Sequence, residues 1–129
     1  MNVIESFHHV HLICADPVKT SRWYVSVLGA EITHEEKKHG AINIRLLIGD
    51  LNLFIRALRE NEEFPLEQNH LQEGIHHIGL MVDDIQEMMK ETTENGAIEI
   101  EEIHTGTTGN WVAFIRTPEG VLIEFLQKK

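Results

Sequence analysis

The sequence predicts an α+β domain made of two copies of one strand–helix–strand–strand–strand unit. A ten-residue phrase occurs twice, first as FHHVHLICAD from residue 7 and then as IHHIGLMVDD from residue 75. A helical pattern ending at a glycine follows each phrase, and three strand-like runs follow each glycine. The spacing of the copies is nearly constant, because His77 lies 68 residues after His9 and Gly96 lies 67 residues after Gly29. A duplication explains these observations better than chance.

Each copy opens with a strand in which two histidines precede an apolar, β-branched run. Successive side chains of a strand point to opposite faces, so His9 and His11 share one face while His8 shares the other with aliphatic residues. We expect the aliphatic face to pack beneath the helices, and His8 and its equivalent His76 either to pack there too or to reach a backbone carbonyl. His77 takes the place of His9 in the second copy, so these two imidazoles are expected on the concave side of the fold.

Each predicted helix has recognisable ends. The first is expected over residues 17–28, with Asp16 as its N-cap. The second is expected over residues 84–94. Gly29 and Gly96 should stop these helices, because glycine enters the left-handed backbone region at little cost.

The strands that follow are bounded by turn residues in both copies. They are expected at residues 31–35, 41–48, 51–57, 98–104, 111–116 and 121–126. The chain, 1–129, is expected to form a single domain, with module one at about 6–58 and module two at about 74–127. An acidic, irregular linker at about 59–73 separates the modules, and loops of that length are often functional.

The composition argues against several classes of partner. The chain has 129 residues and a net charge of −10, which disfavours nucleic acid or an anionic membrane surface as the main partner. Its single cysteine, Cys14, cannot form an intrachain disulfide, which fits a reducing compartment. There is no secretory leader pattern and no apolar run long enough to span a membrane. We therefore expect a cytoplasmic protein that acts on a small molecule.

The last predicted strand contains the most unusual acidic residue of the chain. Glu124 lies inside the apolar run VLIEFL, and a buried carboxylate needs a partner or a cation. Together with His9 and His77 it makes a usual ligand set for a divalent transition metal with open coordination positions. The equivalent position in the first copy, 70 residues earlier, is Phe54. The expected site is therefore His9, His77 and Glu124, without a fourth side-chain ligand.

Other polar and aromatic residues are expected near this site, each with a structural alternative. His11 shares the face of the first ligand and is a candidate general base, or a hydrogen-bonded pocket histidine. Arg45 is suited to bind a carboxylate or phosphate of a substrate, or to form an ion pair with one of the many acidic residues. Asn52 and Phe54 share a face and are candidate substrate contacts. Trp111 either lines the pocket or packs in the core.

In their order and spacing these motifs resemble the vicinal-oxygen-chelate superfamily, which includes glyoxalase I, methylmalonyl-CoA epimerase, fosfomycin-resistance proteins and extradiol dioxygenases. The resemblance rests on the His-His strand, the helix with Trp23 and Tyr24, the phrase GIHHI at 74–78 and the phrase PEGVLIEF at 118–125. It covers roughly residues 6 to 127 and implies two βαβββ modules that form a cupped, incomplete β-barrel. It also implies ligand positions on the first, fourth, fifth and eighth strands, which here are His9, Phe54, His77 and Glu124.

The resemblance implies a metal-dependent lyase or isomerase, similar to lactoylglutathione lyase, whose substrate chelates the metal through adjacent oxygens. The cofactor would be one ion of Ni, Zn, Co, Mn or Fe, with His11 and Glu124 as candidate catalytic groups. Phe54 departs from the family pattern, because glyoxalases and epimerases usually carry Glu or Gln there. Two alternatives stay open, namely an extradiol-type dioxygenase using Fe(II) and a non-enzymatic resistance or ligand-binding protein. Family members are commonly homodimers.

Overall fold

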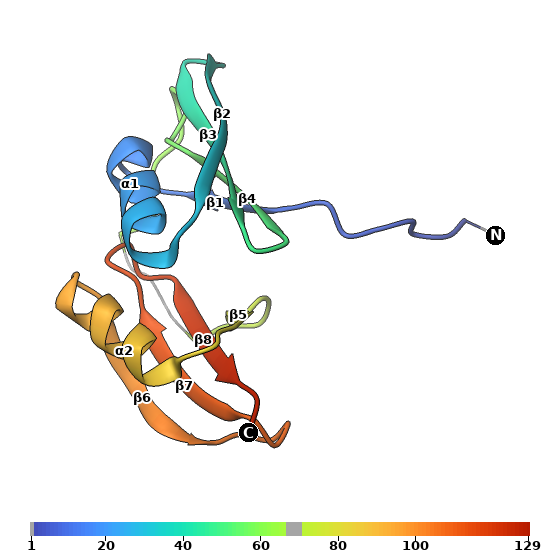
Figure 1. The fold of residues 1–129 in the computed structure, drawn as a ribbon. Coiled ribbons are helices and arrows are strands. Elements are labelled where there is room, and N and C mark those ends of the chain that lie inside the picture. The colour runs from blue at the N-terminus through green and yellow to red at the C-terminus, as the bar shows by residue number, and fades with distance from the viewer. Residues whose placement is uncertain (1, 67–70) are drawn as a thin grey trace. The chain divides into compact units, whose positions relative to one another are not determined.

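The computed structural model describes residues 2–66 and 71–129, and the chain divides into two compact units, Met1–Pro65 and Leu66–Lys129. Each unit contains one helix and four strands (Figure 1). The predicted α+β class and its duplicated βαβββ order are therefore confirmed. The described strands form two four-stranded sheets and no closed barrel.

The first unit contains a sheet with the strand order β1-β4-β3-β2. Its elements are β1 (Val10–Ile13), α1 (Pro17–Leu28), β2 (Glu31–Lys38), β3 (Ala41–Ile48) and β4 (Leu51–Arg56). The short β1 runs parallel to β4, whereas β2, β3 and β4 pair antiparallel through two tight hairpins. At the β2–β3 hairpin His39 and Gly40 have φ angles of 54° and 77°, as a type I′ turn requires.

The second unit repeats this topology with the strand order β5-β8-β7-β6. Its elements are β5 (Ile78–Met81), α2 (Ile85–Glu94), β6 (Ile98–Thr105), β7 (Trp111–Arg116) and β8 (Leu122–Gln127). β5 runs parallel to β8, as β1 does to β4. Because the two units share one topology, strand pairing identifies the residue of one sheet that is equivalent to each residue of the other.

Where the predicted strands differ from the structure, the differences have local causes. β2 extends beyond the predicted end at residue 35, because Glu36 to Lys38 continue to pair with β3 up to the hairpin. β8 begins one residue later than predicted, because the amide and carbonyl of Val121 are bonded to Thr117 in the preceding turn. Residues 67–70 of the expected linker lie outside the described part of the chain.

An aspartate caps the N-terminus of each helix. Oδ1 of Asp16 accepts a hydrogen bond from the amide of Lys19 at 3.1 Å, as predicted for this N-cap. Oδ1 of Asp84 accepts one from the amide of Glu87 at 3.0 Å, so α2 begins one residue after the predicted start. Neither helix of the described chain has the length and apolar character that crossing a membrane requires.

The two helices end differently. α1 ends at Gly29, which has a φ of 71° and whose amide bonds to the carbonyl of Tyr24, so this predicted stop is confirmed. α2 is capped by Asn95, which has an ordinary φ of −110°, and Gly96 follows with a φ of 95°. The left-handed glycine therefore lies just beyond the cap of α2 rather than at it.

Each helix packs on one face of the sheet in its own unit. α1 contacts β2, β3 and β4, and α2 contacts β6, β7 and β8. The buried strand residues on these faces are largely aliphatic and include Ile44, Leu46, Leu53, Ile55, Ala113, Ile115, Ile123 and Phe125. Because side chains alternate along a strand, Phe54 in β4 and Glu124 in β8 belong to the opposite face of each sheet.

Replacing Gly29 by alanine is predicted to lower the free energy of unfolding by about 1 kcal/mol, because a Cβ atom disfavours left-handed backbone. No heavy atom lies within 4 Å of the added Cβ position, so the cost is backbone strain and not a clash. Urea unfolding followed by circular dichroism measures the change. Gly29→Asn is the matched control and should stay closer to wild type, since asparagine tolerates this conformation. Equal losses for the two variants would rule out strain as the cause.

Candidate functional site

Strand pairing places one row of side chains at equivalent positions on both sheets, on the face opposite the helix. In the first unit the row consists of His11 on β1, Phe54 on β4 and Arg45 on β3. In the second unit it consists of Gly79 on β5, Glu124 on β8 and Phe114 on β7. The two units thus present different chemistry on the same framework, with a cation in one row and a carboxylate in the other.

In the second unit the structure brings together two of the three predicted metal ligands. Nε2 of His77 lies 3.3 Å from Oε1 of Glu124, and the two side chains are 31% and 19% exposed. His77 precedes β5 by one residue, and its ring meets the edge of the Phe114 ring at a centroid distance of 5.1 Å. The carboxylate of Glu124 therefore has the polar partner that its place in an apolar strand requires.

The other ring nitrogen of each predicted histidine ligand lies against the histidine before it. Nδ1 of His77 is 2.9 Å from Nδ1 of His76, and Nδ1 of His9 is 2.7 Å from Nδ1 of His8. In each pair one ring donates and the other accepts. A metal on Nε2 of His77 requires that His77 be the donor in its pair. His8 and His76 are exposed, so the expectation that they pack beneath the helices was wrong.

In the first unit the equivalent histidine stacks on the residue that replaces the carboxylate. The rings of His9 and Phe54 are 4.2 Å apart, and their planes differ by 17°. The ring of His11 lies 6.1 Å from each of these two rings. The first unit therefore places its histidine on an aromatic surface, whereas the second unit places its histidine beside a carboxylate.

The pair formed by His77 and Glu124 fits a divalent metal. An imidazole nitrogen and a carboxylate oxygen 3.3 Å apart can both reach one ion, because zinc bonds to these atoms are about 2.0–2.2 Å long. Among the described residues, no three His, Cys, Asp or Glu side chains lie together as a full metal site. The second unit thus contains two of the predicted ligands, and the third, His9, belongs to the first unit.

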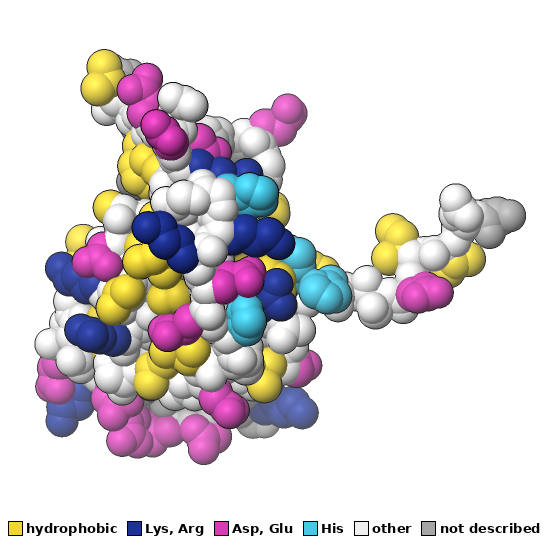
Figure 2. Space-filling model, turned by 90° about the horizontal axis from the view of Figure 1, so that it is seen from above, with side chains coloured by type: hydrophobic (Ala, Val, Ile, Leu, Met, Phe, Trp, Pro, Cys, Tyr) yellow, Lys and Arg dark blue, Asp and Glu magenta, His cyan; other side chains and the backbone are white. Residues whose placement is uncertain are grey.

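A pocket of about 190 Å³ opens beside Phe54 in the first unit. Three cationic side chains line it: Lys38 at the end of β2, Arg45 on β3 and Arg59 after β4. The guanidinium carbon of Arg45 lies 4.9 Å from the centre of the Phe54 ring, which is a cation–π contact. Within the described part of the chain none of the three cations is in an ion pair. Figure 2 shows Lys and Arg side chains beside histidine side chains on the face in view.

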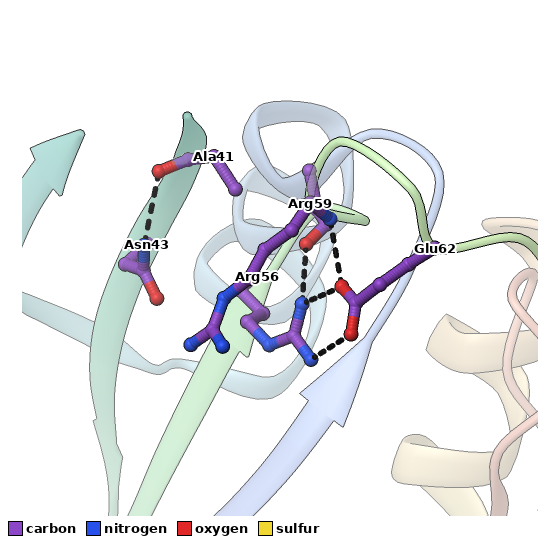
Figure 3. Close-up of polar contacts among 6 residues, drawn as sticks. Ala41, Asn43, Arg56, Arg59 and Glu62 are labelled. Carbon is purple, nitrogen blue, oxygen red and sulfur yellow. Dashed lines mark hydrogen bonds and ion pairs between the residues drawn. The ribbon is translucent and has the colours of Figure 1, made fainter. Parts of the chain in front are cut away.

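Arg56, in contrast, is already neutralised. Its guanidinium nitrogens donate to the carboxylate of Glu62 at 2.6 and 3.2 Å, and its side chain is 11% exposed. Glu62 also accepts a hydrogen bond from the amide of Arg59 at 2.7 Å. These hydrogen bonds lower the pKa of Glu62 to about 2, and the bond from Arg56 is the main cause. Figure 3 shows Glu62 facing Arg56, while the guanidinium of Arg59 points away from Glu62 on the side of Asn43.

The environment of His11 disfavours its protonated form. Partial burial is the main cause that lowers the pKa of His11 below its usual 6.5, and the positive charges of Arg56, His9 and Arg59 lower it further. The imidazole of His11 is therefore neutral near pH 7 and able to accept a proton.

The acidic side chain that lines this pocket is paired with a neighbour. Oε2 of Glu36 lies 3.3 Å from Nε2 of His34. The hydrogen bond from His34 is the main cause that lowers the pKa of Glu36, and the charges of Lys38 and Arg45 add to it. Lys38 and Arg45 thus both act on the carboxylate of Glu36.

Two further predicted substrate contacts, Asn52 and Trp111, have structural contacts of their own. Nδ2 of Asn52 donates to the backbone carbonyl of His8 at 3.1 Å, so this side chain fixes the segment before β1. Trp111 lies three residues from Phe114 in β7 and therefore belongs to the face that carries α2. There it borders a surface depression at the start of that helix. The structure does not bring Trp111 together with Glu124.

Two residues that line the pocket, Lys38 and Arg59, were not predicted from the sequence. Lys38 lies beyond the predicted end of its strand, although the left-handed turn at His39 and Gly40 was a signal that the hairpin extends this far. Arg59 lies in an irregular stretch without periodicity, so no sequence signal places it near Arg45.

Family comparison agrees with the fold. The family profile described as Glyoxalase/Bleomycin resistance protein/Dioxygenase superfamily matches residues 6–125, and the chain belongs to this superfamily. The uncharacterized protein YwkD of Bacillus subtilis (strain 168) is similar to it, with 25% identity over 128 residues. The matched region covers 98% of this chain and 99% of YwkD.

Solved structures of superfamily members share the fold. A glyoxalase family protein from Bacillus cereus has a TM-score of 0.81 at 16% identity, covering 98% of this chain and 95% of that one. The fosfomycin resistance protein FosX from Listeria monocytogenes, complexed with Mn(II) and sulfate, has a TM-score of 0.71 at 17% identity. That match also covers 98% of this chain and 95% of the other. At such identities the likeness establishes the fold, and the activity has to be argued from the residues of this chain.

At pH 7, Glu62→Gln is predicted to lower the free energy of unfolding, because it removes the carboxylate that binds the largely buried Arg56. The folded-state pKa of Glu62, about 2, is below its ordinary value of 4.5. The stabilisation is therefore fully present above pH 4.5 and is lost as the pH falls toward 2. Urea unfolding of wild type and variant at a series of pH values measures this difference.

Glu60→Gln removes the same charge from the same loop and serves as the matched control. It should change the free energy of unfolding little at any pH, because Glu60 forms no ion pair among the described residues. A difference between wild type and Glu62→Gln that stayed constant from pH 7 to pH 3 would show that the ion pair is not its source.

Proposed function

We propose that the protein is a glyoxalase-like enzyme, a lyase or isomerase that binds one divalent transition metal through His9, His77 and Glu124. The observation that carries the proposal is the 3.3 Å approach of Nε2 of His77 to the carboxylate of Glu124. The substrate is a small molecule that chelates the metal through two adjacent oxygens.

His9 is proposed as the third ligand because it is the equivalent of His77 in the sequence repeat. The two histidines also share their local geometry, since Nδ1 of each lies against Nδ1 of the preceding histidine. Phe54 stands where a fourth ligand would be, which leaves coordination positions for the substrate. The Mn(II) named for the FosX structure supports a divalent metal in a protein of this fold.

When bound, the metal would act as a Lewis acid that stabilises negative charge on the chelated oxygens of the substrate. His11 is the proposed general base, because its lowered pKa keeps the imidazole neutral and able to take a proton from the carbon beside a carbonyl. Glu124 is the second candidate for proton transfer. The ring of Phe54 lies 6.1 Å from that of His11 and supplies an apolar surface beside the base.

A second candidate function is an extradiol-type dioxygenase. The observation that favours it is the phenylalanine at residue 54. Because this position has no carboxylate, the proposed ligands are two histidines and one glutamate, and this set also suits Fe(II) and oxygen. Oxygen consumption with a catechol would identify this activity. Turnover of a 2-oxoaldehyde adduct or an acyl-CoA without oxygen would identify the lyase or isomerase. Tight binding without turnover would indicate a resistance or ligand-binding protein.

We also propose that the protein acts in the cytoplasm as a homodimer. Cys14 is the one cysteine of the sequence, so an intrachain disulfide cannot form, which suits a reducing compartment. Ile4 and Phe7 are apolar and largely exposed, so the segment before β1 offers surface that a second copy can cover. Light scattering of the purified protein measures the molecular mass that decides this point.

Metal binding is predicted to require both His77 and Glu124. His77→Ala and Glu124→Ala should each weaken the affinity for Zn²⁺ or Mn²⁺ by at least about 10-fold, since even residues that only support a metal ligand contribute that much. Isothermal titration of the chelator-treated full-length protein measures the affinity. His104→Ala removes an exposed histidine of the same unit and should leave it unchanged. Unchanged affinity in both site variants would refute the proposed function.

A further inference from the structure

Three cations converge on one pocket of the first unit, although the protein is strongly acidic. Lys38, Arg45 and Arg59 line the pocket beside Phe54, and the described part of the chain provides none of them with an ion-pair partner. Lys19 and Arg22 also lie outside the ion pairs of the described chain, so the feature that sets Lys38, Arg45 and Arg59 apart is their position around one pocket. Three such cations at one pocket indicate a place for an external anion.

Basic residues are concentrated in this unit. The unit Met1–Pro65 contains seven of the eleven Lys and Arg residues and nine of the 21 Asp and Glu residues, a net charge of −2. The unit Leu66–Lys129 contains four and twelve, a net charge of −8. Because exposed charges act over about 10 Å at moderate ionic strength, the positive field at the pocket is set mainly by its own surroundings.

The second unit has no cation at the position equivalent to Arg45. Phe114 takes the position of Arg45 in the row that crosses the sheet. A cation at this position is therefore not a requirement of the fold, because the second copy of the module has the same topology without it.

The nearby carboxylates of Glu36 and Glu62 already bind other groups, so the three cations remain able to bind an external anion. Glu36 is paired with His34, and Glu62 binds the guanidinium of Arg56 together with the backbone amide of Arg59. The guanidinium of Arg59 itself points away from Glu62 (Figure 3).

The geometry of Arg45 suits recognition of an oxyanion. Its guanidinium lies over the face of the Phe54 ring, with 4.9 Å between the guanidinium carbon and the ring centre. Such a contact restrains the planar group while its N–H donors, which lie in the plane at its edge, can bind two oxygens of a carboxylate or phosphate.

We propose that Lys38, Arg45 and Arg59 form a subsite that binds a carboxylate or phosphate group of the substrate. The pocket, at about 190 Å³, is smaller than the ~300–1,000 Å³ that encloses a whole small ligand, so it suits one charged group. The ring of Phe54 borders the pocket and provides an apolar contact for the carbon atoms next to that group. This inference rests on the proposed function and narrows it: the substrate is an anionic molecule that also carries the metal-chelating oxygens.

The test is a titration of the metal-free, full-length protein with inorganic phosphate and, separately, with acetate, at constant ionic strength. Nuclear magnetic resonance follows the backbone amide and arginine side-chain signals. Shifts are expected at Arg45, Phe54 and Arg59 with at least one of the two anions, and the stronger binder identifies the substrate group. Arg45→Ala and Arg59→Ala should each weaken binding roughly 10-fold, since a hydrogen bond to a charged group contributes at least that factor.

Arg22→Ala is the matched control, because it removes the same charge from the exposed surface of α1 on the other side of the sheet. It should bind the anion as wild type does. Arg45→Lys keeps the charge without the planar fork and should bind with intermediate affinity, which also covers the case in which Arg45→Ala fails to fold. Unchanged binding in Arg45→Ala and Arg59→Ala, or an equal loss in Arg22→Ala, would overturn the subsite.

The outcomes separate this inference from the metal site. Loss of anion binding in Arg45→Ala with an unchanged affinity for Zn²⁺ supports a distinct subsite. Wild-type protein that binds neither anion overturns the subsite, whereas the metal titration of His77→Ala and Glu124→Ala is unaffected by that result.

Discussion

The parallel pairing of the first strand of each unit with its last strand is the constraint on which the candidate site depends. β1 pairs with β4 and β5 with β8, so residues separated by a helix and two strands come to lie side by side. This register brings the ring of His9 onto that of Phe54 and the ring of His77 next to the carboxylate of Glu124. A shift of one residue would turn the site residues of β4 and β8 toward the helices and expose the aliphatic core. The hydrophobic faces of the strands therefore fix the positions of the polar groups.

On this constrained framework the two copies have taken on different chemistry. Burial under α1 and α2 requires aliphatic residues at the same positions of both sheets, but the opposite face is under no such requirement. One copy uses it for Glu124, a carboxylate held by a histidine, and the other for Arg45, a cation over an aromatic ring. The carboxylate and the cation thus occupy equivalent faces of different units. Duplication allows this because each unit has its own core and can change one face independently.

The features that the sequence predicts well are those with local causes. The Asp16 cap, the glycine stop at Gly29 and the turn residues between strands act on their immediate neighbours, and α1, β3 and β7 have the predicted bounds. Alternation along a strand also correctly places Glu124 on the face of its sheet that is opposite the helix. Contacts between distant segments were not predictable, because no periodicity reports that Arg59 follows β4 into the pocket. Strict counting of alternation would have assigned Trp111 to the helix-covered face.

The most direct test is the anomalous diffraction of crystals grown with MnCl₂. Manganese is predicted at a single position, within about 2.0–2.3 Å of Nε2 of His77 and of a carboxylate oxygen of Glu124, with His9 as the third side-chain ligand. A manganese ion bound elsewhere, with His77 and Glu124 still in direct contact, would contradict the assignment of this pair as metal ligands.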